Sequence, residues 1–229
     1  YGRGIFTTLA VYRGKPFLWE KHWRRIAENA QKVSVNLSEI SENSVKDSVF
    51  ELISANKIET ARVRITFYDE SASKIWNFQT KRNTSVLITS DDLKKTEKNL
   101  HLTVSPFRVN SQSPLVNVKS CNYLENILAL EQIKSRNFDE AVRLNERNEI
   151  VSAIMANLFW IKDEKIYTSP LETGCLAGTM REFLLENETI EEKIINIEEL
   201  LNADEIFLTS SGFFIKSVEK IDGKSLKTT

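Results

Sequence analysis

The stretch Val118-Lys119-Ser120-Cys121-Asn122-Tyr123-Leu124-Glu125-Asn126 decides the fold. The strand-like residues 115–118 run into it, and an apolar period continues through Leu124, Ile127 and Ile133, which predicts a helix. A lysine at such a junction points from a sheet into the cavity beside it. Desolvation lowers the pKa of an amine, so Lys119 is a candidate nucleophile able to form a Schiff base. A single lysine is a weak signal, because most lysines are solvated.

Upstream of this stretch the sequence alternates strands and helices. From Trp19 to Val33 the apolar residues follow a helical stripe, and Ser44 with Asp47 predicts the cap of a second helix. Alternation or β-rich composition predicts strands at residues 4–12, 61–68, 85–89 and 100–104. This mixture predicts an α+β domain at residues 1–109.

Downstream, the polar stretch Asn110-Ser111-Gln112-Ser113-Pro114 predicts an interdomain linker. Residues 115–229 are then expected to form a second domain. Strands are expected at 140–144, at 149–161 as a hairpin or bulged run, at 165–167, and at 205–210 as the last strong strand. Residues 178–186 predict a helix start, and composition favours helix over 188–202.

Composition excludes several classes of protein. The chain has 229 residues, a formal net charge of -1, 41% hydrophobic residues, 7 Gly and 4 Pro, which excludes disordered and collagen-like chains. The balanced charge predicts no nucleic-acid or membrane-surface partner, and no apolar run is long enough to span a membrane. Two cysteines and two distant histidines exclude a disulfide-dense fold and predict no metal site. The chain opens at Tyr1 inside a strand-like run, so we expect further N-terminal sequence, and a cytoplasmic protein is the default.

Two segments could hold a phosphate. The glycine-bounded loop Gly174-Cys175-Leu176-Ala177-Gly178 leads into a helix start at Thr179-Met180-Arg181, whose backbone N–H groups and dipole suit an anion. The strand ending in Thr209-Ser210-Ser211-Gly212 adds hydroxyls. Each segment alone is equally compatible with an ordinary loop or strand end. His22 is better explained as a packed histidine than as a general base.

Seven segments, in order and over nearly the whole chain, resemble the class IV aminotransferases, the pyridoxal-phosphate enzymes of fold type IV. They begin with Tyr1-Gly2-Arg3-Gly4-Ile5-Phe6-Thr7-Thr8, Lys21-His22-Trp23-Arg24-Arg25-Ile26 and the Lys119 stretch. The others are Asp139-Glu140-Ala141, Ala156-Asn157-Leu158-Phe159, Leu176-Ala177-Gly178-Thr179-Met180-Arg181 and Ala203-Asp204-Glu205-Ile206-Phe207-Leu208-Thr209.

The resemblance implies a two-domain enzyme with a smaller N-terminal α/β domain and a larger C-terminal domain, residues 115–229, which is built on a barrel-like sheet and binds the cofactor. Lys119 would hold pyridoxal 5'-phosphate as a Schiff base and carry protons at the substrate Cα. Arg25 would grip the phosphate, with backbone N–H groups of Thr179 and Met180 and a hydroxyl of Ser210 or Ser211. A guanidinium and a helix N-terminus suit a phosphate dianion. Family members are homodimers.

Within the family, several segments resemble 4-amino-4-deoxychorismate lyase. Thr7 stands where transaminases often have Glu, and Arg108 in Ser105-Pro106-Phe107-Arg108 matches a substrate-facing arginine of the lyase. That reaction removes pyruvate from aminodeoxychorismate and leaves 4-aminobenzoate for folate synthesis. The alternatives are a branched-chain or D-amino-acid aminotransferase, also with a small amino-acid-like substrate, and a non-catalytic homologue.

One position departs from the family pattern. Ser152, in Ile150-Val151-Ser152-Ala153, stands where the family places a glutamate that bonds the pyridine nitrogen of the cofactor. In a regular strand Glu149 faces the opposite side, and only a bulge would change that. A serine can only hydrogen-bond a neutral nitrogen, so we expect a weaker electron sink, which disfavours transamination more than elimination.

Overall fold

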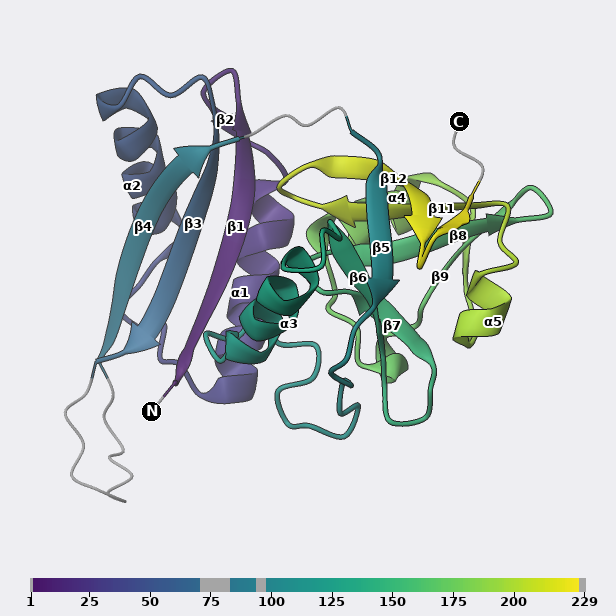
Figure 1. The fold of residues 1–229 in the computed structure, drawn as a ribbon. Coiled ribbons are helices and arrows are strands. Elements are labelled where there is room, and N and C mark those ends of the chain that lie inside the picture. Colours follow the sequence, from purple (N-terminus) through teal and green to yellow (C-terminus); the bar gives the residue numbers. More distant parts are fainter. Residues whose placement is uncertain (1, 71–82, 94–97, 227–229) are drawn as a thin grey trace. The chain divides into compact units, whose positions relative to one another are not determined.

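The computed structural model describes residues 2–70, 83–93 and 98–226 (Figure 1). Tyr1, the first residue of one quoted motif, lies outside them. The chain forms two compact units, one of Tyr1–Lys94 with Val118–Asn122 and one of Lys95–Asn117 with Tyr123–Thr229. Residues 110–114 therefore lie inside the second unit, and 118–122 belong to the first. The domain boundaries predicted from the sequence stay a prediction.

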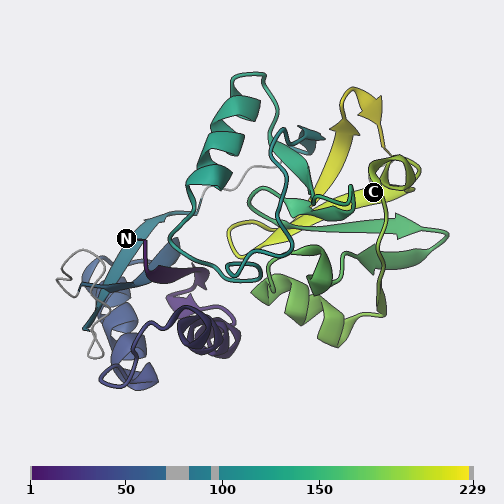
Figure 2. The same ribbon diagram turned by 90° about the horizontal axis from the view of Figure 1, so that it is seen from below.

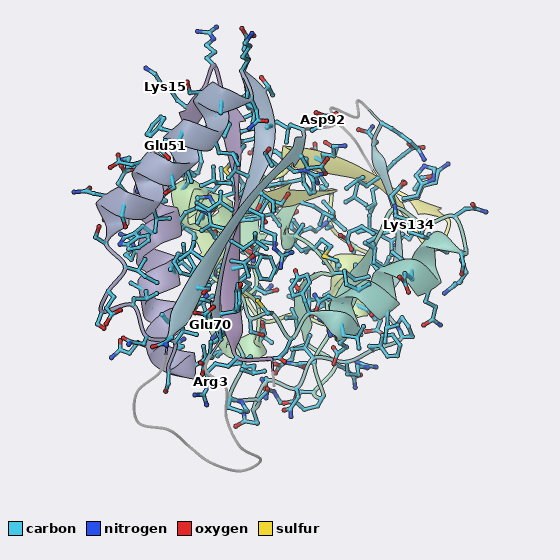
Figure 3. The ribbon with its side chains drawn as sticks, turned by 90° about the vertical axis from the view of Figure 1, so that its left-hand side faces the viewer. Arg3, Lys15, Glu51, Glu70, Asp92 and Lys134 are labelled. Atoms are coloured by element: carbon cyan, nitrogen blue, oxygen red, sulfur yellow. The ribbon has the colours of Figure 1, made fainter. Side chains whose placement is uncertain are left out.

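The first unit is built on a four-stranded antiparallel sheet in the order β2-β1-β3-β4. Its strands are β1 (Gly4–Tyr12), β2 (Lys15–Pro16), β3 (Thr60–Asp69) and β4 (Thr84–Asp92). Because β1 and β3 are antiparallel, the start of one meets the end of the other, and Gly4 pairs with Tyr68. Figure 3 shows the result, with Arg3 and Glu70 at one end of the sheet and Lys15 and Asp92 at the other.

Two helices cover one face of this sheet, α1 (Trp19–Val33) and α2 (Glu42–Ala55) (Figures 1 and 2). The apolar stripe of α1 packs against alternate residues of β1 and β3, among them the fully buried Ile5, Leu9 and Phe67. The predicted helix at Trp19 is confirmed. The predicted cap at Ser44 is wrong by one turn, because the Ser41 hydroxyl accepts the N–H of Ser44 and caps α2.

The second unit is built on a larger, curled sheet, whose described strands run in the order β10-β9-β8-β11-β12-β5-β6-β7, with β13 paired to β12. These strands are β5 (Leu100–Val104), β6 (Glu140–Leu144), β7 (Ile150–Ala153), β8 (Asn157–Lys162), β9 (Lys165–Thr168), β10 (Ile190–Glu192), β11 (Glu205–Ser210), β12 (Phe214–Ile221) and β13 (Lys224–Ser225). Its helices are α3 (Leu124–Lys134), the 3-10 turn η1 (Leu171–Thr173), α4 (Thr179–Asn187) and α5 (Ile197–Leu200). One face of the sheet encloses an apolar core, and α3 packs on the other face of β6 through Ala129 and Ile133.

Three local predictions are wrong. Residues 115–117 form turns and Val118 has no regular structure, so no strand is present there, and Asn117 lies in the left-handed region. The stretch 188–202 is not one helix. Ile190–Glu192 forms β10, which pairs with β9, and Asn196 caps the short α5 through a capping box. Strand β12, which pairs with both β11 and β5, was not foreseen. The α+β class is confirmed.

Candidate active site

Lys119 is fixed to the first unit by backbone hydrogen bonds to β1. The Phe6 N–H donates to the Lys119 carbonyl over 3.0 Å, and the Cys121 N–H donates to the Gly4 carbonyl over 2.8 Å. Between them Ser120 forms an antiparallel bridge with Ile5. This pairing explains why 118–122 belong to the unit that contains β1, although they are distant in sequence. The lysine therefore stands on a rigid strand pairing rather than on a loose loop.

The amine of Lys119 lies among cations and an aromatic ring. Its Nζ is 4.6 Å from the centroid of the Phe6 ring, and the guanidinium carbon of Arg64 is 3.8 Å from the same centroid. Burial and the charges of Arg25 and Arg64 lower the pKa of Lys119 from 10.5 to about 7. A large share of the amine is therefore neutral near neutral pH, which is the nucleophilic form.

Arg25, Thr7 and His22 form one buried hydrogen-bonded group. Arg25 Nη2 donates to the Thr7 hydroxyl over 2.8 Å, and that hydroxyl lies 2.6 Å from His22 Nδ1. Burial and the charges of Arg25 and Lys119 hold the pKa of His22 well below 6.5, so the ring is neutral. Since Thr7 accepts from Arg25, its own proton goes to His22 Nδ1, which leaves the proton of the imidazole on Nε2. Thr7 thus positions Arg25, and His22 is the packed histidine that the sequence predicted.

The second unit brings the predicted phosphate-binding residues together. Gly178 caps α4, and the Thr179 hydroxyl lies 3.0 Å from the Ser211 hydroxyl. A Cβ on Gly178 would stand 2.0 Å from Asn157 Oδ1, so only glycine fits this approach. Asn157 in turn donates to the Leu176 carbonyl over 2.8 Å and fixes the loop before α4.

The remaining predicted phosphate ligands are also in this region. Met180 is buried in the first turn of α4. The Ser210 hydroxyl accepts the N–H of Gly212, so Ser211 rather than Ser210 faces Thr179. Thr209 was noted from the sequence among the strand-end hydroxyls without being given a role, and its buried hydroxyl has no hydrogen-bond partner among the described residues. The hydroxyls of Thr179 and Ser211 at the start of a helix form a donor set that fits a phosphate.

Ser152 lies on β7, where its hydroxyl donates to the Ala153 carbonyl over 2.8 Å. The pairing of β6 with β7 shifts register beside it, because Arg143 pairs with Ser152 but Leu144 pairs with Ile150. The strand is therefore bulged, which is one of the two forms expected for residues 149–161 and not the regular strand on which the prediction for Glu149 was based. The Glu149 carboxylate is nevertheless held by the side chains of Arg147 and Asn145, and it does not replace the missing glutamate.

The segment after Ser152 is held by a buried carboxylate that the sequence did not single out. Glu140 accepts the N–H groups of Ala141, Ile154 and Met155 over 3.0, 3.0 and 3.1 Å. Burial raises the pKa of Glu140 from 4.5 to about 7, despite these three donors. Arg108, the predicted substrate ligand, is an exposed residue of the second unit and donates to the Asn145 carbonyl over 3.2 Å.

The model of the family described as amino-transferase class IV matches residues 4–221. The chain belongs to this family. It is 31% identical to the aminodeoxychorismate lyase of Bacillus subtilis (strain 168), over 97% of this chain and 78% of the relative. It is 25% identical to the D-alanine aminotransferase of Bacillus licheniformis, over 99% of this chain and 81% of the relative.

A solved structure supports the same assignment. The branched-chain aminotransferase of Thermoproteus uzoniensis superposes with a TM-score of 0.92 at 25% identity, and covers 100% of this chain and 81% of its own. The resemblance inferred from the motifs is confirmed, as are the fold-type-IV architecture and the enzyme class, a lyase or aminotransferase of class IV. No helix in the described ranges is both long and apolar enough to cross a membrane.

Proposed function

We propose that this protein is a pyridoxal-phosphate-dependent lyase that eliminates pyruvate from aminodeoxychorismate and releases 4-aminobenzoate. The observation that carries the proposal is the Lys119 amine, which is anchored to β1 and has its pKa lowered to about 7. When bound, the cofactor supplies an aldehyde for this amine and a ring that accepts electrons from the substrate Cα. The neutral amine of Lys119 would hold this aldehyde covalently, with loss of water, and once freed it would move a proton at the reacting carbon.

The other residues bind and orient the cofactor. Arg25, held by Thr7, would donate to the phosphate through its guanidinium. In the second unit, the hydroxyls of Thr179 and Ser211 and the N–H of Met180 at the start of α4 would bind a phosphate, with Ser210 shaping the turn. Ser152 would face the ring nitrogen and Arg108 a carboxylate of the substrate. Thr7, which the sequence predicted to face the substrate, would instead position Arg25 for the phosphate.

Two observations favour the lyase over an aminotransferase. Among the relatives described above, the lyase has the higher identity, 31% against 25%. The Thr7 hydroxyl, at a position where transaminases often carry Glu, is engaged with Arg25 and His22. The aminotransferase remains the alternative, because relatives of both kinds match almost the whole chain. We further propose a homodimer in the cytoplasm that acts in folate synthesis.

The first experiment tests the cofactor. The purified protein is incubated with pyridoxal 5'-phosphate, reduced with borohydride and digested, and the modified peptide is identified by mass spectrometry. We expect modification at Lys119 and none in Lys119→Ala, whereas Lys162→Ala, which removes a surface lysine paired with Asp204, is modified like the wild type. A wild type that stays colourless and unmodified would contradict the proposal and favour a non-catalytic homologue.

The second experiment separates the two reactions. Release of 4-aminobenzoate from aminodeoxychorismate is compared with amino transfer to keto acids from D-alanine and from branched-chain amino acids. We expect release of 4-aminobenzoate to dominate. Amino transfer without release of 4-aminobenzoate, in protein modified at Lys119, would identify an aminotransferase instead.

A further inference from the structure

Arg143 is a buried cation on the same face of the sheet as Ser152. The two residues are paired directly across β6 and β7, and opposite residues of an antiparallel pair project to the same side. The side chain of Arg143 is only 8% exposed. Helix α3 packs on this part of the sheet (Figure 1). A permanent positive charge is therefore placed beside the position where the family has a negative one.

The contacts of Arg143 leave its Nε–H donor available to another group. Its Nη2 pairs with the carboxylate of Glu125, and its Nη1 lies 3.4 Å from the Asn126 side-chain oxygen, both on α3. Its Nε is buried and has no hydrogen-bond partner in the part of the chain that the structure describes. Buried N–H donors are rarely left without an acceptor, so this one indicates an acceptor that the described residues do not supply.

We propose that Arg143, which pairs with Ser152 across the sheet, meets the ring nitrogen of the bound cofactor and keeps that nitrogen unprotonated. This rests on the proposed function. A guanidinium only donates and stays charged, so it suits the lone pair of a neutral pyridine nitrogen and disfavours a second positive charge there. A neutral ring is the weaker electron sink. Arg143 is thus a specificity residue that disfavours amino transfer relative to elimination.

The other charged groups on the packed elements do not reverse this effect. Glu125 is already paired with Arg143, and its side chain is 57% exposed. The Glu140 carboxylate is occupied by three backbone N–H groups. Lys134, at the end of α3, is a further cation and pairs with Asp139. Within the described residues, the charged group paired across the sheet from Ser152 is therefore a cation.

The experiment uses cofactor labelled with nitrogen-15 in the ring, bound to the full chain, and follows the nitrogen chemical shift against pH. We expect the shift of an unprotonated pyridine in the wild type near neutral pH. Arg143→Leu should raise the pKa of the ring nitrogen by about one to three, the effect of removing a neighbouring like charge. Arg143→Leu combined with Ser152→Glu should give a protonated nitrogen at neutral pH. Glu125→Gln, the matched control, keeps the guanidinium and should leave the nitrogen unprotonated.

Each result decides the proposal. A wild type whose ring nitrogen is protonated, or an Arg143→Leu variant that titrates like the wild type, overturns it. A Glu125→Gln variant that changes the titration as strongly assigns the effect to Glu125 and also overturns it. If circular dichroism shows that Arg143→Leu does not fold, Arg143→Gln, which keeps N–H donors without the charge, takes its place. Protein that is not modified at Lys119 overturns the proposed function and this proposal with it, whereas modified protein with a protonated ring nitrogen overturns this proposal alone.

Discussion

Lys119 is a buried base and Glu140 a buried acid, and the protein shifts the pKa of both to about 7. Burial and two neighbouring arginines lower the pKa of the Lys119 amine from 10.5 to about 7. Burial raises the pKa of the Glu140 carboxyl from 4.5 to about 7, against the effect of its three backbone donors. The amine lies among Phe6, Arg25 and Arg64 in the first unit, whereas the carboxylate ties together the backbone of the second.

The difference shows that a perturbed pKa alone does not identify a catalytic group. The acceptor capacity of Glu140 is used by the N–H groups of Ala141, Ile154 and Met155, so its role is to shape the segment after Ser152. Lys119 is instead surrounded by charges that repel its protonated form, which produces a nucleophile. What distinguishes the two groups is the chemistry of their neighbours.

The two groups also make the stability change with pH in opposite directions. For Lys119 the folded pKa lies below the unfolded value, so the unfolded chain binds more protons between about pH 7 and 10.5, and stability rises with pH in that window. For Glu140 the folded pKa lies above the unfolded value, so the folded chain binds more protons between about pH 4.5 and 7. The contribution of Glu140 to the stability is therefore greatest below about pH 4.5 and falls as the pH rises to about 7. Both groups therefore lower the stability most near neutral pH.

The largest expected effect is that of Lys119→Met. Without the amine, turnover should fall by at least about 10²–10⁴-fold, the usual contribution of a group that transfers protons, with a further loss from the missing covalent attachment. In the cofactor-free protein, the rise in stability between about pH 7 and 10.5 should disappear. Product release and urea unfolding measure the two effects. Lys162→Met is the control. Equal effects of both substitutions would contradict the role of the Lys119 amine as the nucleophile.

Glu140→Gln tests the other half of the comparison. One pKa unit corresponds to about 1.4 kcal/mol, so the wild type should lose about 3 kcal/mol of unfolding free energy between pH 4.5 and 7 from this group. The variant should lack this loss, although its amide nitrogen cannot accept the N–H of Met155. Urea unfolding followed by circular dichroism measures the slope. Glu131→Gln, an exposed glutamate of α3, should keep the wild-type slope.

The contrast also shows what the sequence could predict. The helices at Trp19 and Leu124 and the strands at residues 100–104 and 140–144 follow from local period and composition, and the structure confirms them. Lys119, Arg25 and Thr179 were found through ordered motifs. The roles of Arg64, Glu140 and Arg143 were not foreseen, because they depend on pairing between distant strands. The bulge beside Ser152 was expected only as an alternative to a hairpin, since register is set by partners that the local pattern does not specify.

Thr7→Val tests how far the surroundings of Lys119 depend on a single hydroxyl. The substitution keeps the shape of the side chain and removes the acceptor of Arg25 and the donor of His22, both buried. We expect a loss of about 1–3 kcal/mol in unfolding free energy, the cost of unsatisfied buried polar groups, and weaker binding of pyridoxal 5'-phosphate. Thr8→Val, on the opposite face of β1, is the control. Equal cofactor affinity in Thr7→Val and the wild type would show that Arg25 needs no support from Thr7.

Ser41→Ala provides a loss of stability in the first unit that involves no titrating group. The Ser41 hydroxyl accepts the N–H of Ser44 at the start of α2, so its removal should cost about 1 kcal/mol. Ser44→Ala keeps that N–H and should cost less, which separates the cap seen in the structure from the one predicted at Ser44. Urea unfolding should show the Ser41→Ala loss unchanged from about pH 5 to 9, because neither Lys119 nor Glu140 contacts this cap. A loss that changed with pH would mean that groups other than Lys119 also make the stability of this unit depend on pH. The pH dependence of the unfolding free energy that is assigned to the Lys119 amine would then belong partly to those groups.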